Sequence, residues 1–139
     1  MRGLILLCDA AEVLNGKLYI LGGGWTKILI TPQRPTVNLT ISAVVYFSWV
    51  DTNQQKTIDI SLFTQDGHLV NINDNPIQVR GPVEVGRPPG LVNGTEIELP
   101  LATRFEGLEL SAGRYEWRMS IDEELLASAI FDVLDARAH

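Results

Sequence analysis

Residues 110–122 read Leu-Ser-Ala-Gly-Arg-Tyr-Glu-Trp-Arg-Met-Ser-Ile-Asp. From residue 115 onward, apolar and polar side chains alternate without a break, which is the period of a strand with one buried and one solvated face. Four apolar residues share one side of this strand and are expected in the core: Tyr115, Trp117, Met119 and Ile121. We predict that this strand lies at the centre of an all-β domain.

The rest of the chain consists of short strand-like runs separated by turn signals at intervals of roughly 8–12 residues, with no amphipathic helical stretch. This pattern predicts an antiparallel β-sandwich of about nine short strands. The approach from Gly113 to Tyr115 resembles the turn before the penultimate strand of immunoglobulin-like domains, so we expect that type of sandwich. A length of 139 residues fits one domain. We assign residues 1–134 to the sandwich and residues 135–139 to a frayed tail.

Charge and cysteine content restrict the partners and the compartment. The net charge is −6, and all of it comes from residues 84–139, which hold eleven acidic and five basic residues. This balance argues against nucleic-acid and anionic-membrane partners. The single cysteine, Cys8, excludes an internal disulfide and favours a reducing compartment. Asp9 interrupts the apolar N-terminal run before it reaches the length of a signal peptide, so we expect a soluble, cytoplasmic protein.

The dipeptide Asn15-Gly16 separates two strand-like runs and predicts a β-hairpin with a two-residue type I′ turn. The predicted register pairs Leu14 with Lys17, Val13 with Leu18, Ala11 with Ile20, and Asp9 with Gly22. It places Asp9 on an apolar face, beside Gly22, Gly23 and Gly24. Since a buried carboxylate needs hydrogen-bond donors, we predict that Asp9 is a structural residue that accepts bonds from the glycine backbone at this corner.

Apolar residues on outward faces suggest self-association. The long strand predicted over Val37–Trp49 keeps Val44 and Tyr46 opposite its core-facing side, and Phe63 lies outward on the next strand. We expect these three residues to form a patch that a second copy covers in a homodimer. Trp25, which follows the glycine run, is a further interaction candidate because an exposed tryptophan often contacts a partner.

Searches for catalytic and metal-binding patterns identify no catalytic residue and no cofactor site. The glycine run lacks a phosphate-binding pattern and a following helix, so we interpret it as a corner between strands. His68 and His139 are far apart, and one cysteine does not complete a zinc set. Five residues near a turn could supply oxygen ligands to calcium, although turn chemistry explains them equally well: Asp66, Asn71, Asn73, Asp74 and Asn75.

Four stretches of the chain carry a resemblance to a known family: residues 7–11 (Leu-Cys-Asp-Ala-Ala), 16–25, 85–90 and 113–117. Together they resemble a family of small bacterial proteins known only as a domain of unknown function. The resemblance extends over most of the chain, and the N-terminal motif formed by the first two stretches is the most specific. It implies no activity, cofactor or catalytic residue.

Three functions remain open from the sequence. The first is a non-enzymatic interaction or assembly module, acting as a homodimer or with a protein partner that the sequence does not identify. The second is a module that binds a small ligand such as a carbohydrate, with Trp25 at the site. The third is an enzyme that uses Asp9 as an acid or base. A concave pocket with convergent polar groups would favour the second or third, and a broad apolar surface would favour the first.

Overall fold

A computed structural model of the chain, which describes residues 1–137, is all-β, as predicted. Its eleven strands exceed the nine expected, and two of the eleven are only two residues long. A 3-10 helix, η1 (Trp49–Asp51), joins two of the strands. Within residues 1–137, no helix has the length and apolar character needed to cross a membrane. The strands are β1 (Arg2–Leu14), β2 (Lys17–Gly23), β3 (Lys27–Ile30), β4 (Val37–Phe47), β5 (Lys56–Thr64), β6 (Asn71–Ile72), β7 (Asn75–Pro76), β8 (Gln78–Val83), β9 (Ile97–Leu108), β10 (Gly113–Ile121) and β11 (Glu124–Asp135).

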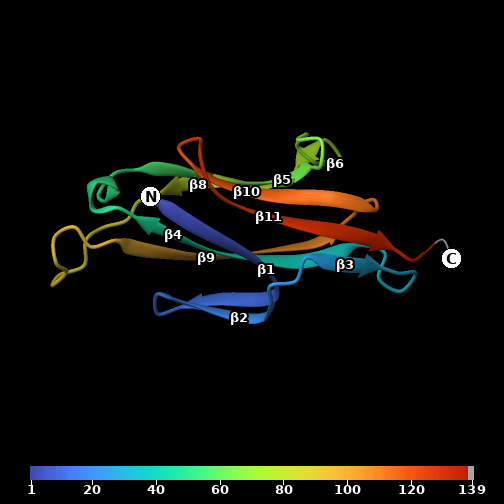
Figure 1. Ribbon diagram of the computed structural model, residues 1–139, viewed down its shortest axis with the longest axis horizontal. Coiled ribbons are helices and arrows are strands. Elements are labelled where there is room, and N and C mark those ends of the chain that lie inside the picture. The colour runs from blue at the N-terminus through green and yellow to red at the C-terminus, as the bar shows by residue number, and fades with distance from the viewer. Residues whose placement is uncertain (138–139) are drawn as a thin grey trace.

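The strands form two large sheets that lie on either side of one hydrophobic core (Figure 1). The four-stranded sheet has the order β2-β1-β4-β9, and the five-stranded sheet has the order β3-β11-β10-β5-β8. The prediction of a wholly antiparallel arrangement is wrong at one position, because β3 pairs with β11 in parallel. Parallel neighbours need a long connection, and here most of the chain provides it.

Strand β10 contributes its apolar side to the core, as the alternation predicted. Tyr115, Trp117, Met119 and Ile121 are all buried, and Trp117 has no exposed surface. The Trp117 ring packs against Phe105 of the facing sheet, with the ring centroids 4.9 Å apart. Residues of β5 lie beside them in register, so the core side of the five-stranded sheet is continuous.

Strand β4 is one of the two inner strands of the opposite sheet, and its core-facing residues are almost fully buried: Leu39, Ile41, Ala43, Val45 and Phe47. The strand ends at Phe47, two residues before the predicted end. Trp49 instead begins helix η1, where the Arg87 guanidinium lies 4.1 Å from the centroid of its ring. The Arg87 cation therefore covers the Trp49 ring even though this residue lies outside the strand.

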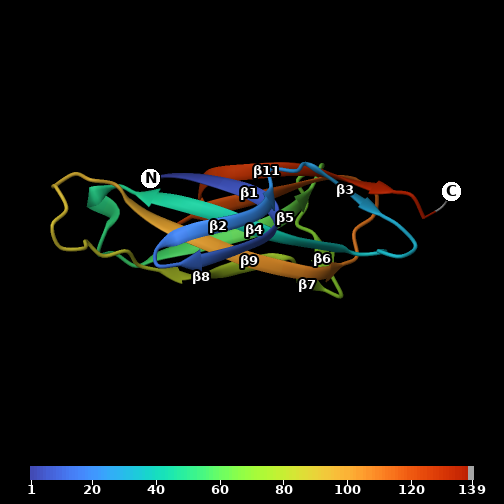
Figure 2. The same cartoon turned by 90° about the horizontal axis from the view of Figure 1, so that it is seen from below.

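Strand β1 changes its partner in the middle. Arg2–Cys8 pairs with β4, whereas the following half pairs with β2. The hairpin of β1 and β2 therefore leaves the plane of the sheet and crosses the outer face of β4 and β9, as Figure 2 shows from below. The Arg104 side chain of β9 donates to the Asp9 carbonyl over 2.9 Å and holds the hairpin against that face.

The turn of this hairpin has the predicted geometry. Asn15 and Gly16 have φ values of 52° and 73°, the left-handed conformations that a type I′ turn requires. Three of the predicted pairs are confirmed, namely Leu14 with Lys17, Val13 with Leu18, and Ala11 with Ile20. The Asn-Gly signal was therefore sufficient to fix the local register.

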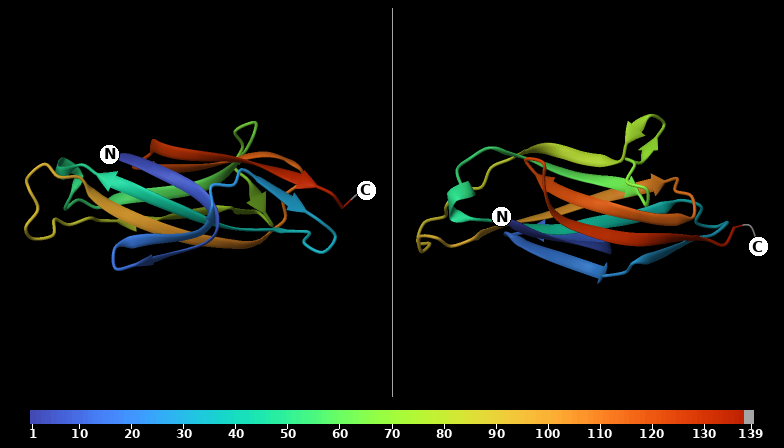
Figure 3. Two further views of the ribbon diagram at one scale, coloured as in Figure 1. Left: turned by 60° about the horizontal axis from the view of Figure 1, so that its bottom comes forward. Right: turned by 45° about the horizontal axis from the view of Figure 1, so that its top comes forward.

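Two smaller features depart from the expected boundaries. Strands β6 and β7 form a small separate ladder that projects from the five-stranded side of the molecule (Figure 3). At the other end, β11 includes Asp135, and the Ala136 N–H donates to the Ile30 carbonyl over 3.0 Å. The backbone pairing thus continues beyond the predicted domain boundary at residue 134. The rest of the predicted tail, residues 138–139, lies outside the described residues.

We expect the Trp117→Ala variant to lose about 3–5 kcal/mol of unfolding free energy, because it removes a fully buried ring and leaves a cavity between the sheets. Chemical denaturation monitored by circular dichroism would measure this loss. Val92→Ala, at a side chain that is 76% exposed in a loop, serves as the control and should change stability by less than about 0.5 kcal/mol. A loss below about 1 kcal/mol for Trp117→Ala would contradict the assignment of β10 as a core strand.

We expect Cys8 to be unreactive in the folded protein. Its side chain is fully buried, its Sγ lies 3.5 Å from the Thr40 carbonyl oxygen, and burial raises the pKa of the thiol. The reactive thiolate is therefore disfavoured near neutral pH. A thiol reagent such as DTNB should label the protein in concentrated guanidinium chloride and leave the native protein unlabelled. Rapid labelling of the native state would show that this part of β1 opens.

Candidate functional site

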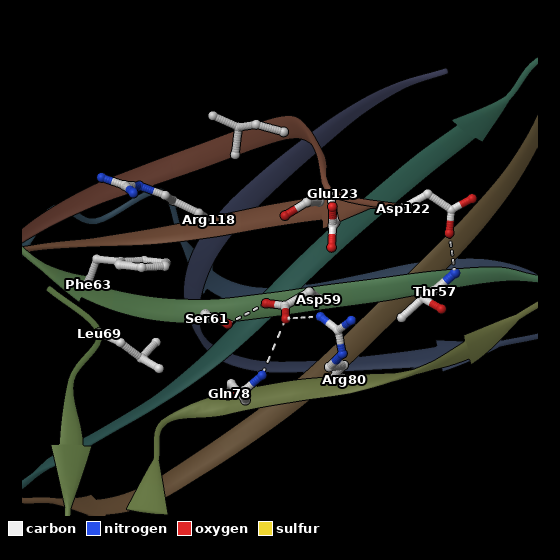
Figure 4. A pocket seen from close by; sticks show the side chains of 12 residues that line it. Thr57, Asp59, Ser61, Phe63, Leu69, Gln78, Arg80, Arg118, Asp122 and Glu123 are labelled. Carbon is white, nitrogen blue, oxygen red and sulfur yellow. Dashed lines mark hydrogen bonds and ion pairs between the residues drawn. The ribbon is translucent and has the colours of Figure 1, made fainter. Parts of the chain in front are cut away.

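A groove with a volume of about 660 Å³ lies on the outer face of the five-stranded sheet (Figure 4). Strand β5 supplies its floor. Because alternate residues of this strand, including Ile60 and Leu62, point into the core, the residues between them must point outward. These outward residues all line the groove: Thr57, Asp59, Ser61 and Phe63.

The Asp59 carboxylate is held by three donors from two strands. Arg80 of β8 donates from Nη1 to Oδ2 over 2.9 Å, and Gln78 donates from Nε2 to the same oxygen over 3.3 Å. The Ser61 hydroxyl donates to Oδ1. Since only a fifth of the Asp59 side chain is exposed, this network fixes a carboxylate at the floor of the groove and a guanidinium beside it, on the wall formed by β8.

Strand β10 forms the opposite wall and presents Arg118. Its guanidinium lies 4.3 Å from the centroid of the Phe63 ring, and its Nε donates to the Glu116 carboxylate. Figure 4 shows the Phe63 ring between Arg118 and Leu69. Both contacts restrict Arg118, so this end of the groove has a fixed cationic group above an apolar base.

The turn between β10 and β11 supplies the remaining carboxylates. Asp122 and Glu123 have φ values of 47° and 71°, a left-handed pair in which glycine or asparagine is more usual. The Asp122 carboxylate accepts a hydrogen bond from the Thr57 N–H over 2.8 Å, and its second oxygen lies 3.8 Å from Lys56 Nζ. By contrast, Glu123 is exposed and makes no side-chain hydrogen bond or ion pair within residues 1–137.

The groove thus combines fixed charges of both signs with hydroxyl groups. Three carboxylates and two guanidiniums line it, together with the hydroxyls of Thr57, Ser61 and Ser120. Such a surface can donate and accept hydrogen bonds from several directions at once. In the described part of the chain, no group of three or more His, Cys, Asp or Glu side chains is arranged to hold a metal ion.

The prediction for Asp9 is wrong. Its side chain is exposed, and no glycine N–H within residues 1–137 donates to its carboxylate. The hairpin face on which it lies is only half-buried, so the carboxylate is accessible to solvent. The neighbourhood itself was predicted correctly, because a Cβ placed on Gly22 would clash with Asp9 Oδ2. Gly22 has a φ of 61°, and the corner is closed by the Gly24 N–H, which donates to the Leu7 carbonyl over 2.8 Å.

Trp25 lies away from the groove and is partly buried. Its ring meets Phe131 edge-on, with the centroids 6.3 Å apart, and it packs against the core. A cavity of about 170 Å³ borders it, and its Nε1–H is buried without a hydrogen-bond partner among the described residues. The indole, which follows β2 in the chain, therefore contributes mainly to packing against β11 and the core, and it does not stand at the mouth of a large site.

The three residues predicted to form one apolar patch lie on two different sheets. Val44 and Tyr46 belong to β4 in the four-stranded sheet, whereas Phe63 belongs to β5 in the five-stranded sheet. All three are half-buried. The Arg2 guanidinium covers the Tyr46 ring at 3.9 Å, in the same way as Arg118 covers Phe63. A shared docking patch at these positions is therefore excluded.

The candidate calcium residues serve as turn residues. Asn71 and Asn75 donate from their side-chain amides to nearby backbone carbonyls, and Asn73 and Asp74 adopt the left-handed conformations of the turn between β6 and β7. His68 is an exposed residue in the preceding turn. His139 lies outside the described residues.

Sequence reasoning missed the groove because its residues come from separate strands. Asp59, Arg80 and Glu123 are each an ordinary polar residue on an outward face when they are considered alone. The one available signal was the run Thr57, Asp59, Ser61 on alternate positions of a predicted strand. This run predicts which side chains of β5 point outward, but the strands on either side of β5 could not be identified without the order of strands in the sheet.

A second surface is formed by the hairpin of β1 and β2. It exposes more large apolar side chains than any other part of the described chain, and Leu21 has the greatest exposure among them, at 72%. These side chains lie on both faces of the hairpin, because successive residues of a strand point to opposite faces. Together we call them the hairpin surface: Leu4, Leu6, Val13, Leu14, Tyr19, Ile20 and Leu21. Strand β2 is also the edge of its sheet, so one side of its backbone has no partner strand among residues 1–137.

Comparison with known proteins gives a family. None of the curated proteins matches the chain. One family model, described as a family of unknown function (DUF6941), matches residues 3–134. This match includes nine of the eleven strands in full and all but one terminal residue of β1 and of β11. The chain therefore belongs to DUF6941, a family of unknown function, in agreement with the resemblance noted from its motifs.

Proposed function

We propose that the chain is a non-enzymatic interaction module that assembles as a homodimer through the hairpin surface. One observation carries this proposal: β2 is an apolar edge strand without the features that normally prevent edge strands from pairing. An exposed edge offers unpaired N–H and C=O groups to another strand. Natural proteins usually protect such edges with charge, proline, a bulge or short length.

The other three edges of the two large sheets have this protection. Strand β9 carries Pro100 together with the charged residues Arg104 and Glu106, and β8 carries Arg80 and, one residue before its end, Pro82. Strand β3 is only four residues long. By comparison, β2 contains no proline, and its single charge, Lys17, lies next to the turn. The contrast supports β2 as the edge that is kept available for a partner.

A second copy is a suitable partner because β2 is complementary to itself. If two copies pair antiparallel with Ile20 opposite Ile20, then Tyr19 lies opposite Leu21 and Leu18 lies opposite Gly22. Aromatic and aliphatic side chains directly opposite one another stabilise a ladder. Only one surface is required for a two-fold interface, and this register puts no like charges opposite each other.

Charge distribution also favours association through this part of the chain. Residues 1–24 contain two acidic and two basic residues and are neutral overall, although the whole chain carries −6. Two copies that meet at their hairpins would therefore keep their acidic regions apart. Like-charge repulsion opposes association most strongly where charges of one sign face each other, and the hairpin avoids this.

Two further points support the non-enzymatic and cytoplasmic parts of the proposal. Cys8, the strongest potential nucleophile, is a buried thiol whose pKa is raised by burial, which favours its inert form. Asp9, the acid or base considered for an enzymatic function, does not line the groove on the five-stranded sheet. A single unpaired cysteine is also typical of a reducing compartment such as the cytoplasm.

We also infer that the fold is an immunoglobulin-like sandwich. The Tyr115 hydroxyl donates to the Ser111 carbonyl over 2.8 Å, from the start of the penultimate strand to a residue four positions earlier. A tyrosine that bonds back to the preceding backbone at this point is a recurrent feature of such sandwiches. Two residues later, where antibody domains carry a buried cysteine, this chain has the buried Trp117, which contacts the facing sheet.

The proposal predicts a particle of about twice 15.4 kDa in multi-angle light scattering at micromolar concentration. The Leu21→Lys variant should shift the chain to a 15.4 kDa monomer, because it places a charge in the apolar edge and would face Tyr19 of the second copy. Val92→Lys is the matched control, since it adds the same charge at an equally exposed apolar residue in a loop. It should leave the dimer intact.

A wild-type chain that is monomeric throughout this range would contradict the homodimer. A dimer that Leu21→Lys leaves intact would contradict the assignment of β2 as its interface.

A further inference from the structure

We propose that the groove on the outer face of the five-stranded sheet binds a neutral, hydroxyl-rich ligand of about the size of a disaccharide. This site is distinct from the hairpin surface, which belongs to the four-stranded sheet. The proposed ligand site therefore does not depend on the proposed dimer.

The first argument is that the polar side chains of the groove are already held in place. On an ordinary solvated face, long charged side chains rotate freely, and a ligand that immobilises them loses affinity. Here Asp59 is fixed by three donors, and Arg118 is fixed by Glu116 and the Phe63 ring. Preorganised groups of this kind are typical of binding sites.

The second argument concerns the groups that remain free to bind. The Glu123 carboxylate has no partner within residues 1–137 and can accept hydrogen bonds. Arg80 engages Asp59 through Nη1, which leaves its Nε and Nη2 as donors in the described structure, and half of its side chain is exposed. The hydroxyls of Thr57 and Ser120 can act in either direction.

This combination selects the class of ligand. Each hydroxyl of a sugar both donates and accepts, so one neutral molecule can satisfy Glu123 on one wall and Arg80 on the other. An anion would meet the carboxylates of Asp122 and Glu123, and a cation would meet the guanidiniums of Arg80 and Arg118. Charges of both signs around one hollow therefore disfavour ions of either sign more than they disfavour a neutral polyol.

The dimensions agree with a ligand of two rings. Strands β10 and β8 flank β5, so their backbones lie roughly 10 Å apart at the usual spacing between strands. A single sugar ring is shorter than this span, whereas two linked rings extend across it. The groove volume of about 660 Å³ lies within the range of small-molecule sites.

Apolar side chains complete the site. Phe63, Leu69 and Leu125 line the groove, and Leu125 is more than half exposed. Sugars present C–H groups as well as hydroxyls, and these C–H groups can cover apolar surface of this kind. The groove thus offers both kinds of contact that a carbohydrate makes.

The test is a titration of the isotopically labelled, full-length protein with four neutral disaccharides: maltose, cellobiose, lactose and sucrose. Binding is followed by backbone amide shifts in NMR spectra. We expect at least one of them to shift residues 57–63, 78–80 and 118–125 in a saturable manner. Lysine and glutamate are the charged comparison ligands. The proposal is overturned if no disaccharide binds, if the shifts lie elsewhere, or if a charged amino acid binds more tightly.

Two matched variants locate the site. Glu123→Gln removes the free carboxylate and should weaken disaccharide binding about ten-fold, because it replaces a charge-assisted hydrogen bond with a neutral one. Glu124→Gln removes the same charge from the adjacent exposed residue, which does not line the groove, and should leave the affinity unchanged. Equal effects of the two changes, or none from Glu123→Gln, would overturn the assignment of Glu123 to the site.

Discussion

The alternation of side chains along β5 and β10 determines both the core and the groove. Met119 lies beside Ile60, and Trp117 lies beside Leu62, with all four buried between the sheets. The residues between them must then point outward, which brings Arg118 beside Ser61. A slip of one residue would exchange the two faces completely. The free energy gained by burying the apolar side therefore also positions the polar groups of β5 and β10 that line the groove.

The change of partner in β1 has a comparable effect on the opposite sheet. After Cys8 the strand leaves β4 and turns across the outer face with β2, where Arg104 binds its backbone. This cover explains why Thr40 and Ser42, two polar residues on that face, are buried. The Ser42 hydroxyl donates to the Leu6 carbonyl over 2.8 Å and so remains hydrogen-bonded. The same turn of the hairpin leaves β2 as an exposed edge strand, so the burial of Thr40 and Ser42 is accompanied by the exposure of β2.

Local patterns in the sequence predicted the local structure well. The alternation from Tyr115 to Ile121 and the turn at Asn15-Gly16 depend on neighbouring residues only, and both predictions are confirmed. The prediction that Asp9 is buried was wrong because its burial depends on which segments cover the hairpin face, and the register alone does not determine them. The groove was not predicted for a similar reason: the contact between Asp59 and Arg80 depends on the order of β5 and β8 in a sheet. Sheet order is set by packing of the whole chain, and no short motif encodes it.

The positions of the two surfaces allow them to act together. The hairpin surface and the groove lie on opposite sides of the core, as the separation of β2 from β5 and β8 in Figure 1 shows. Pairing of β2 with a second copy would extend the hairpin on the outer side of the four-stranded sheet and leave the outer face of the five-stranded sheet open. A dimer built in this way would present two grooves at a fixed separation. Two linked sites bind a ligand that carries repeated units more tightly than one site does, provided that the spacing lets both engage. Weak binding of a single disaccharide is therefore compatible with strong binding of a longer chain of sugars.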